Sequence, residues 1–275
     1  MWKTVLRSLR AGVVTTRYPD QRTEPPEAFR GAPAIRPGAS FADLAPPEVC
    51  PSGAIGAPEG GRYAIDLARC VFCGRCASGA PDGPIHMSRD FELSARRRED
   101  LLVAARRDQQ GVTVPDQHPG GAELETRVRS EIRRVLGRSL HLRHLDSGSC
   151  NACDWELSAL LGPFYDCRRL GIDFVASPRH ADGVIVTGPV TRNLEVAVAR
   201  TYLAVPEPRL VIAVGACACS GGIVGRGYAS AGGVGEVLPV DVYIPGCPPR
   251  PEAILFGILV ALGRLEPRLT RARTS

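Results

Sequence analysis

Three short apolar runs, each followed by cysteine within five residues, constrain the fold of this chain most strongly. The runs cover residues 140–145, 210–215 and 242–246, and their length and composition are typical of buried β-strands. If these strands are parallel neighbours, the loops at their carboxyl ends meet at one edge of a sheet, where open α/β sheets bind ligands. Soft thiolates gathered there predict a [4Fe–4S] or zinc site. The thiols in these loops belong to Cys150, Cys153, Cys217 and Cys247.

From residue 139 onward, short apolar runs alternate with helical patterns. Strands are expected at 140–145, 172–176, 183–187, 210–215 and 241–245, and helices at 153–161, 192–204 and 251–263. This alternation predicts an α/β fold with a flavodoxin-like, doubly wound parallel sheet. Such a fold also suits FMN, but the cysteines occupy the place of a phosphate-binding loop of Ser, Thr and Gly. We prefer Cys217 to the nearby Cys219 as a ligand because it comes first after its strand.

A second cysteine group lies upstream and has the spacing of bacterial ferredoxins. Cys70, Cys73 and Cys76 form a C-x2-C-x2-C run, a pattern that binds iron–sulfur clusters. The following Cys-Pro position is missing, since Ala80 stands there, but Cys50 precedes the run and is followed by proline. Together these four cysteines predict one [4Fe–4S] cluster, so we expect two [4Fe–4S] clusters in the whole chain.

The two cysteine groups favour iron over zinc and metal over disulfides. Zinc knuckles use paired C-x2-C units or histidine, and no histidine has that spacing here. Ten cysteines in a secreted protein could form disulfides, but C-x2-C spacing beside Gly and Pro fits a metal site assembled in a reducing cytoplasm. Neither a signal peptide nor an apolar run long enough to span a membrane is found.

The remaining patterns divide the chain into segments. Residues 2–12 predict a basic amphipathic helix, which could lie on a membrane surface or dock on a protein. Arginine supplies all but one of the 34 basic residues, which indicates a bacterial, GC-rich coding sequence. The expected segments are an N-terminal helix and extended arm (1–48), a ferredoxin-like domain (49–92), a polar linker (93–121), the α/β domain beginning with a helix at 122–137 (122–265), and a basic tail (266–275).

The motifs in the α/β domain resemble a known family. GSCNACDWE, VGACACSGG and IPGCPPRPEAI are similar to segments of the small subunit of membrane-bound [NiFe]-hydrogenases of the formate hydrogenlyase type, and of the 20 kDa subunit of respiratory complex I. Complex I has an adjacent Cys-Cys pair, whereas this chain has Cys150-Asn-Ala-Cys153, the hydrogenase-like spacing. The resemblance implies that Cys150, Cys153, Cys217 and Cys247 bind the proximal [4Fe–4S] cluster.

The N-terminal part resembles the polyferredoxin-type subunit of the same complexes, in GVVTTRYP at 12–19 and across 49–92. That family carries two clusters, so this chain has lost one site. The resemblances imply an electron-transfer subunit, peripheral on the cytoplasmic side of the membrane, with a hydrogenase or complex I-type large subunit and membrane-arm subunits as partners. A ferredoxin or a formate dehydrogenase is the candidate electron donor, and no nucleic acid is expected to bind.

Several alternatives stay open at this point. The same scaffold could serve a quinone- or ferredoxin-linked enzyme without a Ni–Fe site. A structural zinc protein and a free-standing soluble carrier are the alternatives from other classes. The sequence offers no nucleophile–base pair, so the active site is expected in the large subunit. Asp154 and Glu156, beside the first cysteine pair, could tune a cluster or move protons, or Asp154 could simply favour a helix N-terminus. Arg179 and His180 could face the cluster or the large subunit, or form a structural salt bridge.

Overall fold

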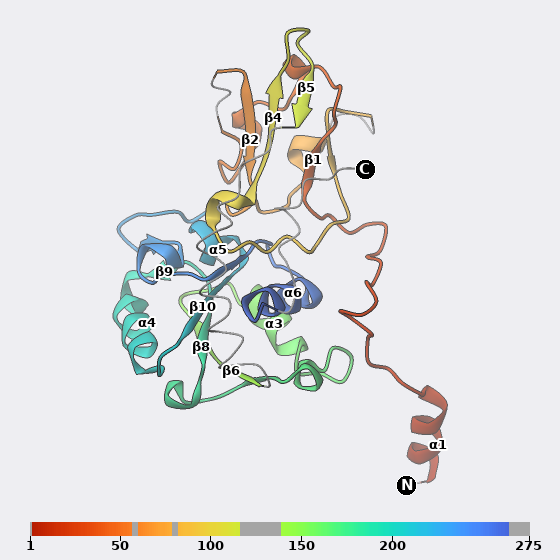
Figure 1. Ribbon diagram of the computed structural model, residues 1–275, viewed down its shortest axis with the longest axis vertical. Helices are drawn as coiled ribbons and strands as arrows, with labels where there is room; N and C mark the ends of the chain where they lie inside the picture. Colours follow the sequence, from red (N-terminus) through yellow and green to blue (C-terminus); the bar gives the residue numbers. More distant parts are fainter. Residues whose placement is uncertain (1, 57–59, 79–81, 116–138, 264–275) are drawn as a thin grey trace.

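The computed structural model describes residues 2–56, 60–78, 82–115 and 139–263. Its C-terminal half is built on five parallel strands in the order β12–β10–β8–β6–β7 (Figure 1). Counted along the chain, this is the 2-1-3-4-5 order of flavodoxin-like sheets, so the predicted α/β fold with a parallel sheet is confirmed. The strands are β6 (Leu140–Asp146), β7 (Ile172–Phe174), β8 (Gly183–Thr187), β10 (Leu210–Val214) and β12 (Val242–Ile244).

Helices cover both faces of this sheet. α3 (Ala152–Ala159) and α6 (Pro251–Ala261) pack on one face, and α4 (Arg192–Ala204) and α5 (Gly215–Ser220) pack on the other. Because both faces are covered, every residue of β8 and β10 is buried. Every residue of α6 is also buried, including Glu252, whose carboxylate accepts hydrogen bonds from Arg250. A short antiparallel pair, β9 (Val190–Thr191) and β11 (Ser230–Gly232), lies beside α4.

The N-terminal half contains two small antiparallel sheets. β1 (Pro33–Ile35) pairs with β3 (Ile85–Met87), and β4 (Leu102–Arg107) pairs with both β2 (Arg62–Asp66) and β5 (Thr113–Pro115). Single turns of 3-10 helix occur at Phe41–Asp43, Pro47–Val49, Arg75–Ala77, Arg98–Leu101, Cys167–Leu170, Pro178–His180 and Val234–Glu236.

The expectation of a linker at 93–121 is wrong for the described part of that segment. It carries β4 and β5, which form a hairpin around a turn at Asp108–Gly111. The Asp108 carboxylate accepts hydrogen bonds from the backbone N–H groups of Gln110 and Val112, which fixes the turn. The strands have solvent-facing polar residues, so their composition resembles that of a linker. The helix expected at 122–137 and the basic tail at 266–275 lie outside the described residues.

The two halves share one apolar core. Ile65, Leu67 and Ile85 of the N-terminal half belong to the same buried cluster as Val184 and Val211 of the parallel sheet. Ala95 and Tyr243 also exchange a pair of backbone hydrogen bonds, each N–H donating to the carbonyl of the other residue. This pair joins the N-terminal half to the outer edge of β12. Residues 49–92 are therefore supported by packing against the parallel sheet.

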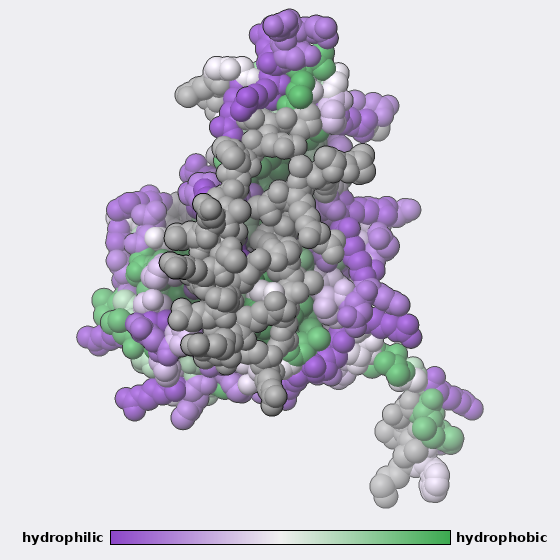
Figure 2. Space-filling view, in the orientation of Figure 1, coloured by the Kyte–Doolittle hydropathy of each residue, from purple (hydrophilic) through white to green (hydrophobic). Residues whose placement is uncertain are grey.

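The first 30 residues run along the C-terminal half before they enter the small sheets. The backbone N–H of Thr16 donates to the carbonyl of Phe164, and the fully buried Tyr18 donates its hydroxyl hydrogen to Glu92 at 2.8 Å. Ahead of this arm, α1 (Trp2–Ala11) extends away from the body of the molecule (Figure 1). Apolar side chains of α1 face solvent (Figure 2), among them Trp2, which is 81% exposed.

Candidate iron–sulfur sites

The structure brings the four N-terminal cysteines together. Cys50 follows the turn Pro47–Val49, and the other three lie in the loop between β2 and β3. All four line one enclosed cavity, together with apolar residues such as Ile55 and Ile65. Burial, with smaller contributions from the nearby thiols of Cys76, Cys50 and Cys73, raises the pKa of Cys70 to about 12. We call this set, Cys50, Cys70, Cys73 and Cys76, the first thiol set.

Backbone and side-chain donors point at the sulfurs of the first thiol set. The N–H of Ala54 donates to Cys50 Sγ at 3.2 Å, and the N–H of Phe72 donates to Cys70 Sγ at 3.3 Å. Burial alone would raise the pKa of Cys50, but the Ser52 hydroxyl and the backbone N–H groups of Ala54, Ser52 and Ile55 lower it overall. Phe72 has a φ of +54°, which is uncommon for an aromatic residue. In this backbone conformation its N–H donates to Cys70 Sγ.

The other four predicted ligands also come together, at the carboxyl edge of the parallel sheet. Cys150 lies in the loop after β6 and Cys153 in the first turn of α3, while Cys217 lies in α5 after β10 and Cys247 follows β12. Burial raises the pKa of Cys153 strongly, and the thiols of Cys217, Cys247 and Cys150 add to the shift. We call these four residues the second thiol set. β8 lies between β6 and β10, so the strands that carry the thiols are not all direct neighbours.

Glycines leave room around the second thiol set. A Cβ on Gly215, whose φ is +87°, would lie 2.6 Å from Cys153 Sγ. A Cβ on Gly222, whose φ is +56°, would lie 3.0 Å from Cys217 Sγ. Both positions therefore need glycine for its backbone conformation and for the close approach of backbone to sulfur.

Both thiol sets have the chemistry that a [4Fe–4S] cluster requires. Four thiolates form the usual ligand set, and N–H groups directed at sulfur are a recurrent part of such sites. Within the described residues, no three or more Cys, His, Asp or Glu side chains lie in an arrangement for a single metal ion. The residues fit a cluster because each set supplies four thiols. The thiols of each set also lie close enough together that the others raise the pKa of Cys70 and of Cys153.

The two remaining cysteines lie in the core. Cys219 is 3% exposed, and its Sγ contacts the carbonyl of Ala213 at 3.7 Å, on the inner side of α5. Burial raises its pKa strongly. Cys167 is fully buried, and burial raises its pKa to about 11. Of the two cysteines in α5, Cys217 is therefore the one that lies beside the other thiols.

Asp154 is the centre of a polar network that the sequence did not reveal. Its carboxylate accepts hydrogen bonds from the hydroxyls of Ser149 and Thr187, the latter at 2.7 Å, and lies 2.8 Å from His144 Nε2. The network ties α3 to β6 and β8 beside Cys153. His144 and Thr187 lie in stretches of sequence that predict strands, and nothing in those stretches indicates a functional role. Arg179, the other candidate neighbour of the cluster, precedes β8 and so lies at the opposite edge of the sheet.

A hydrogen bond and a shared cavity connect the two thiol sets. The hydroxyl of Ser220, in α5, donates to the carbonyl of Ala68 at 2.8 Å, two residues before Cys70. On another side, one cavity is lined by both Cys73 and Cys247, together with apolar residues such as Phe72 and Pro248. No sequence pattern predicted either contact, because each joins residues more than 150 positions apart.

Comparisons with known proteins place this chain among oxidoreductase subunits. The model of the family described as "NADH ubiquinone oxidoreductase, 20 Kd subunit" matches residues 150–261. The chain is 46% identical over 142 residues to "Probable membrane-bound hydrogenase subunit" of Pyrococcus furiosus, covering 52% of this chain and 84% of the relative. It is 41% identical over 163 residues to formate hydrogenlyase subunit 7 of Escherichia coli, covering 59% of this chain and 63% of the relative.

A third relative is a subunit of the NADH-quinone oxidoreductase of Citrifermentans bemidjiense, 46% identical, with 45% of this chain and 69% of the relative covered. Among solved structures, a chain of the membrane-bound sulfane sulfur reductase, an archaeal respiratory membrane complex, is 32% identical and covers 53% of this chain and 78% of its own, with a TM-score of 0.43. The chain belongs to the 20 kDa subunit family of NADH ubiquinone oxidoreductase. Members of this family bind a [4Fe–4S] cluster.

Proposed function

We propose that this chain relays electrons between two [4Fe–4S] clusters, one held by the first thiol set and one by the second. When bound, each cluster accepts and releases one electron. The residues of the chain hold the clusters and exclude water with apolar walls, and in the first thiol set the N–H groups of Ala54 and Phe72 are directed at the sulfurs. The active site belongs to a partner large subunit that docks beside the second thiol set.

The observation that carries this proposal is the connection between the thiol sets. α5 bears Cys217 of the second set, and its last residue, Ser220, is hydrogen-bonded to Ala68 beside Cys70 of the first set. The cavity shared by Cys73 and Cys247 gives a second approach between the two sets. Two sites joined in this way within one core have a fixed separation, which a relay of electrons requires.

Exposed apolar side chains support a partner beside the second thiol set. Trp155 is 75% exposed and follows Cys153 by two residues, while Ile223 and Val224, each 64% exposed, follow Cys217 in the next loop. Large apolar side chains in such positions are typical of a surface that another protein covers. They count against a free-standing soluble carrier.

The proposed location is the cytoplasmic surface of the membrane. Within the residues described, no helix is both long enough and apolar enough to cross a bilayer. The relatives are named as subunits of membrane-bound hydrogenase, formate hydrogenlyase and NADH-quinone oxidoreductase. The exposed apolar and basic side chains of α1, with Leu9 74% exposed, fit attachment to membrane-arm subunits.

A Ni–Fe enzyme is the first candidate for the complete complex, because the Cys150-Asn-Ala-Cys153 spacing is hydrogenase-like. The alternative is a quinone- or ferredoxin-linked enzyme without nickel. Two C-x2-C pairs in the large subunit encoded beside this chain would support the first candidate, and their absence would leave the second.

The test is to measure iron and acid-labile sulfide in anaerobically purified protein, followed by EPR after reduction with dithionite. About eight iron atoms and eight sulfides per chain, with signals from two interacting clusters, are expected. Zinc without sulfide, or iron for a single cluster, would refute the relay and make one thiol set structural.

A further inference from the structure

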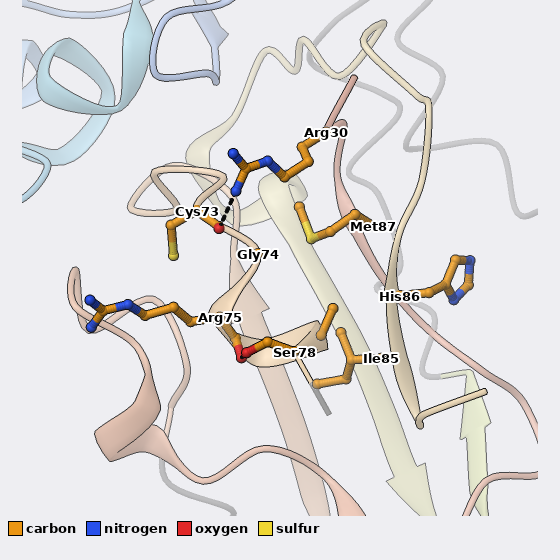
Figure 3. Close-up of a pocket in the computed structure, with 9 residues that line it drawn as sticks. Arg30, Cys73, Gly74, Arg75, Ser78, Ile85, His86 and Met87 are labelled. Atoms are coloured by element: carbon orange, nitrogen blue, oxygen red, sulfur yellow. Dashed lines mark hydrogen bonds between the residues drawn. The ribbon is translucent and has the colours of Figure 1, made fainter. Parts of the chain in front are cut away.

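In the first thiol set, Cys50, Cys73 and Cys76 are partly exposed. Cys70 is buried, and the four cysteines of this set line the enclosed cavity described above. Of the four, Cys73 alone also lines an open surface pocket, next to Gly74, Arg75 and Ser78 (Figure 3). A redox partner that approaches through this pocket would come closer to the first cluster than one approaching across the apolar core.

The charge around this opening is positive. Arg30, Arg75 and His86 line the pocket, and none of the described residues in its lining is acidic. Arg30 and Arg75 are both exposed and lie on either side of Cys73 (Figure 3). The guanidinium of Arg30 donates to the carbonyl of Cys73 at 2.5 Å, so one positive charge is fixed directly beside the ligand.

Gly74 shapes the opening. Its φ is +79°, and a Cβ there would lie 3.4 Å from Cδ of Arg30. The left-handed backbone at Gly74 turns the ligand loop beside the stem of Arg30, so that Cys73 and Arg30 both line the pocket. The pocket is thus a shallow, basic approach to a predicted cluster ligand.

We infer that this basic pocket, formed around Cys73 by Arg30, Arg75 and His86, is the docking surface for a small acidic redox protein that exchanges electrons with the first cluster. The inference rests on the proposed relay function. A positive surface attracts an acidic partner over a distance of about one Debye length and orients it during the encounter. The face of the second thiol set, with exposed Trp155 and Ile223, is apolar and suits a permanent subunit instead.

The test uses anaerobic stopped-flow reduction of the cluster-loaded chain by a reduced acidic ferredoxin, with dithionite as a small reductant for comparison. In the wild-type protein, the second-order rate with ferredoxin is expected to fall at least tenfold as the ionic strength rises from about 0.01 M to about 1 M. Arg75→Glu should lower the low-salt ferredoxin rate by about tenfold or more, and should lower the rate of reduction by dithionite, a small anion, much less. Arg75→Lys keeps the positive charge and should keep most of the wild-type rate with ferredoxin.

Arg107→Glu is the matched control, because Arg107 is exposed on β4 in the same half of the molecule, away from the pocket lining, and the change in net charge is identical. An equal loss of rate in Arg75→Glu and Arg107→Glu would overturn the docking surface, as would a wild-type rate that does not depend on salt. If Arg75→Glu loses iron, the salt dependence of the wild type and the rate of Arg75→Lys decide instead. Missing iron in the wild type would refute the relay itself, and is measured first.

Discussion

Replacing Gly215 with alanine tests whether the second thiol set holds a cluster of its own. Gly215 has a φ of +87°, and the new Cβ would lie 2.6 Å from Cys153 Sγ. The left-handed backbone costs an alanine about 1–2 kcal/mol. Ordinary contacts between carbon atoms lie near 3.5–4.0 Å, so the overpacking adds about 1–3 kcal/mol. Cys153 lies in the first turn of α3 and cannot retreat without moving that helix.

Gly225→Ala is the matched control. Gly225 has a φ of +66°, and a Cβ there would meet nothing within 4 Å. This variant therefore carries the backbone cost without the contact with sulfur. Gly215→Ala should be less stable than Gly225→Ala by the overpacking energy, and each kcal/mol lowers Tm by about 2–4 °C for a chain of this size.

Iron and sulfide content measured with EPR distinguishes the variants. Gly215→Ala is expected to keep about four iron atoms per chain, those of the first cluster, and to lose the signal of the second. Gly225→Ala is expected to keep about eight. Full iron content in Gly215→Ala, together with a Tm equal to that of the control, would show that the predicted crowding around Cys153 has no bearing on a cluster.

Three further variants test other contacts. Cys70→Ser removes a thiolate from the first set and should lower iron by about four atoms per chain, whereas Cys219→Ser should not change iron content, because Cys219 faces the carbonyl of Ala213. The reverse result would assign Cys219 as a ligand. Ser220→Ala removes the hydrogen bond to Ala68 and should cost about 1 kcal/mol, seen as a lower Tm and faster amide exchange at residues 66–70; unchanged exchange would speak against a link between the thiol sets. Asp154→Asn leaves a donor facing the hydroxyls of Ser149 and Thr187 and should cost about 1–3 kcal/mol. It also removes a negative charge beside Cys153, so an EPR redox titration should give a more positive midpoint potential for the second cluster. An unchanged potential would mean that Asp154 has a purely structural role.

The C-terminal sheet was predictable because its signals are local. Runs such as Leu210–Val214 are apolar at every position and end at glycine, and α4 was expected at the range that the structure shows. The cysteine spacings likewise identify residues that do come together, since C-x2-C and strand-end positions have few geometric solutions. Their role as cluster ligands stays a prediction.

The N-terminal half was less predictable because its strands are short and half exposed. β4 has arginines at its exposed end, and the turn at Asp108 is polar, so composition alone suggested a linker. The core shared by Ile65 and Val184 joins residues far apart in the chain, and a single sequence carries no signal for such a contact. The same holds for Arg30, whose place beside Cys73 depends on the path of the arm.

The shared core also determines the order in which this protein can mature. Chains fold from the N-terminus as the ribosome makes them, yet Ile65 and Leu67 pack against Val184 and Val211, which are synthesised more than a hundred residues later. Tyr18 likewise belongs to one buried cluster with α6, and the backbone N–H of Thr16 donates to the carbonyl of Phe164. Both contacts can form only after these later residues have been synthesised. The half that is synthesised first can therefore complete its packing only after β8 and β10 have been synthesised.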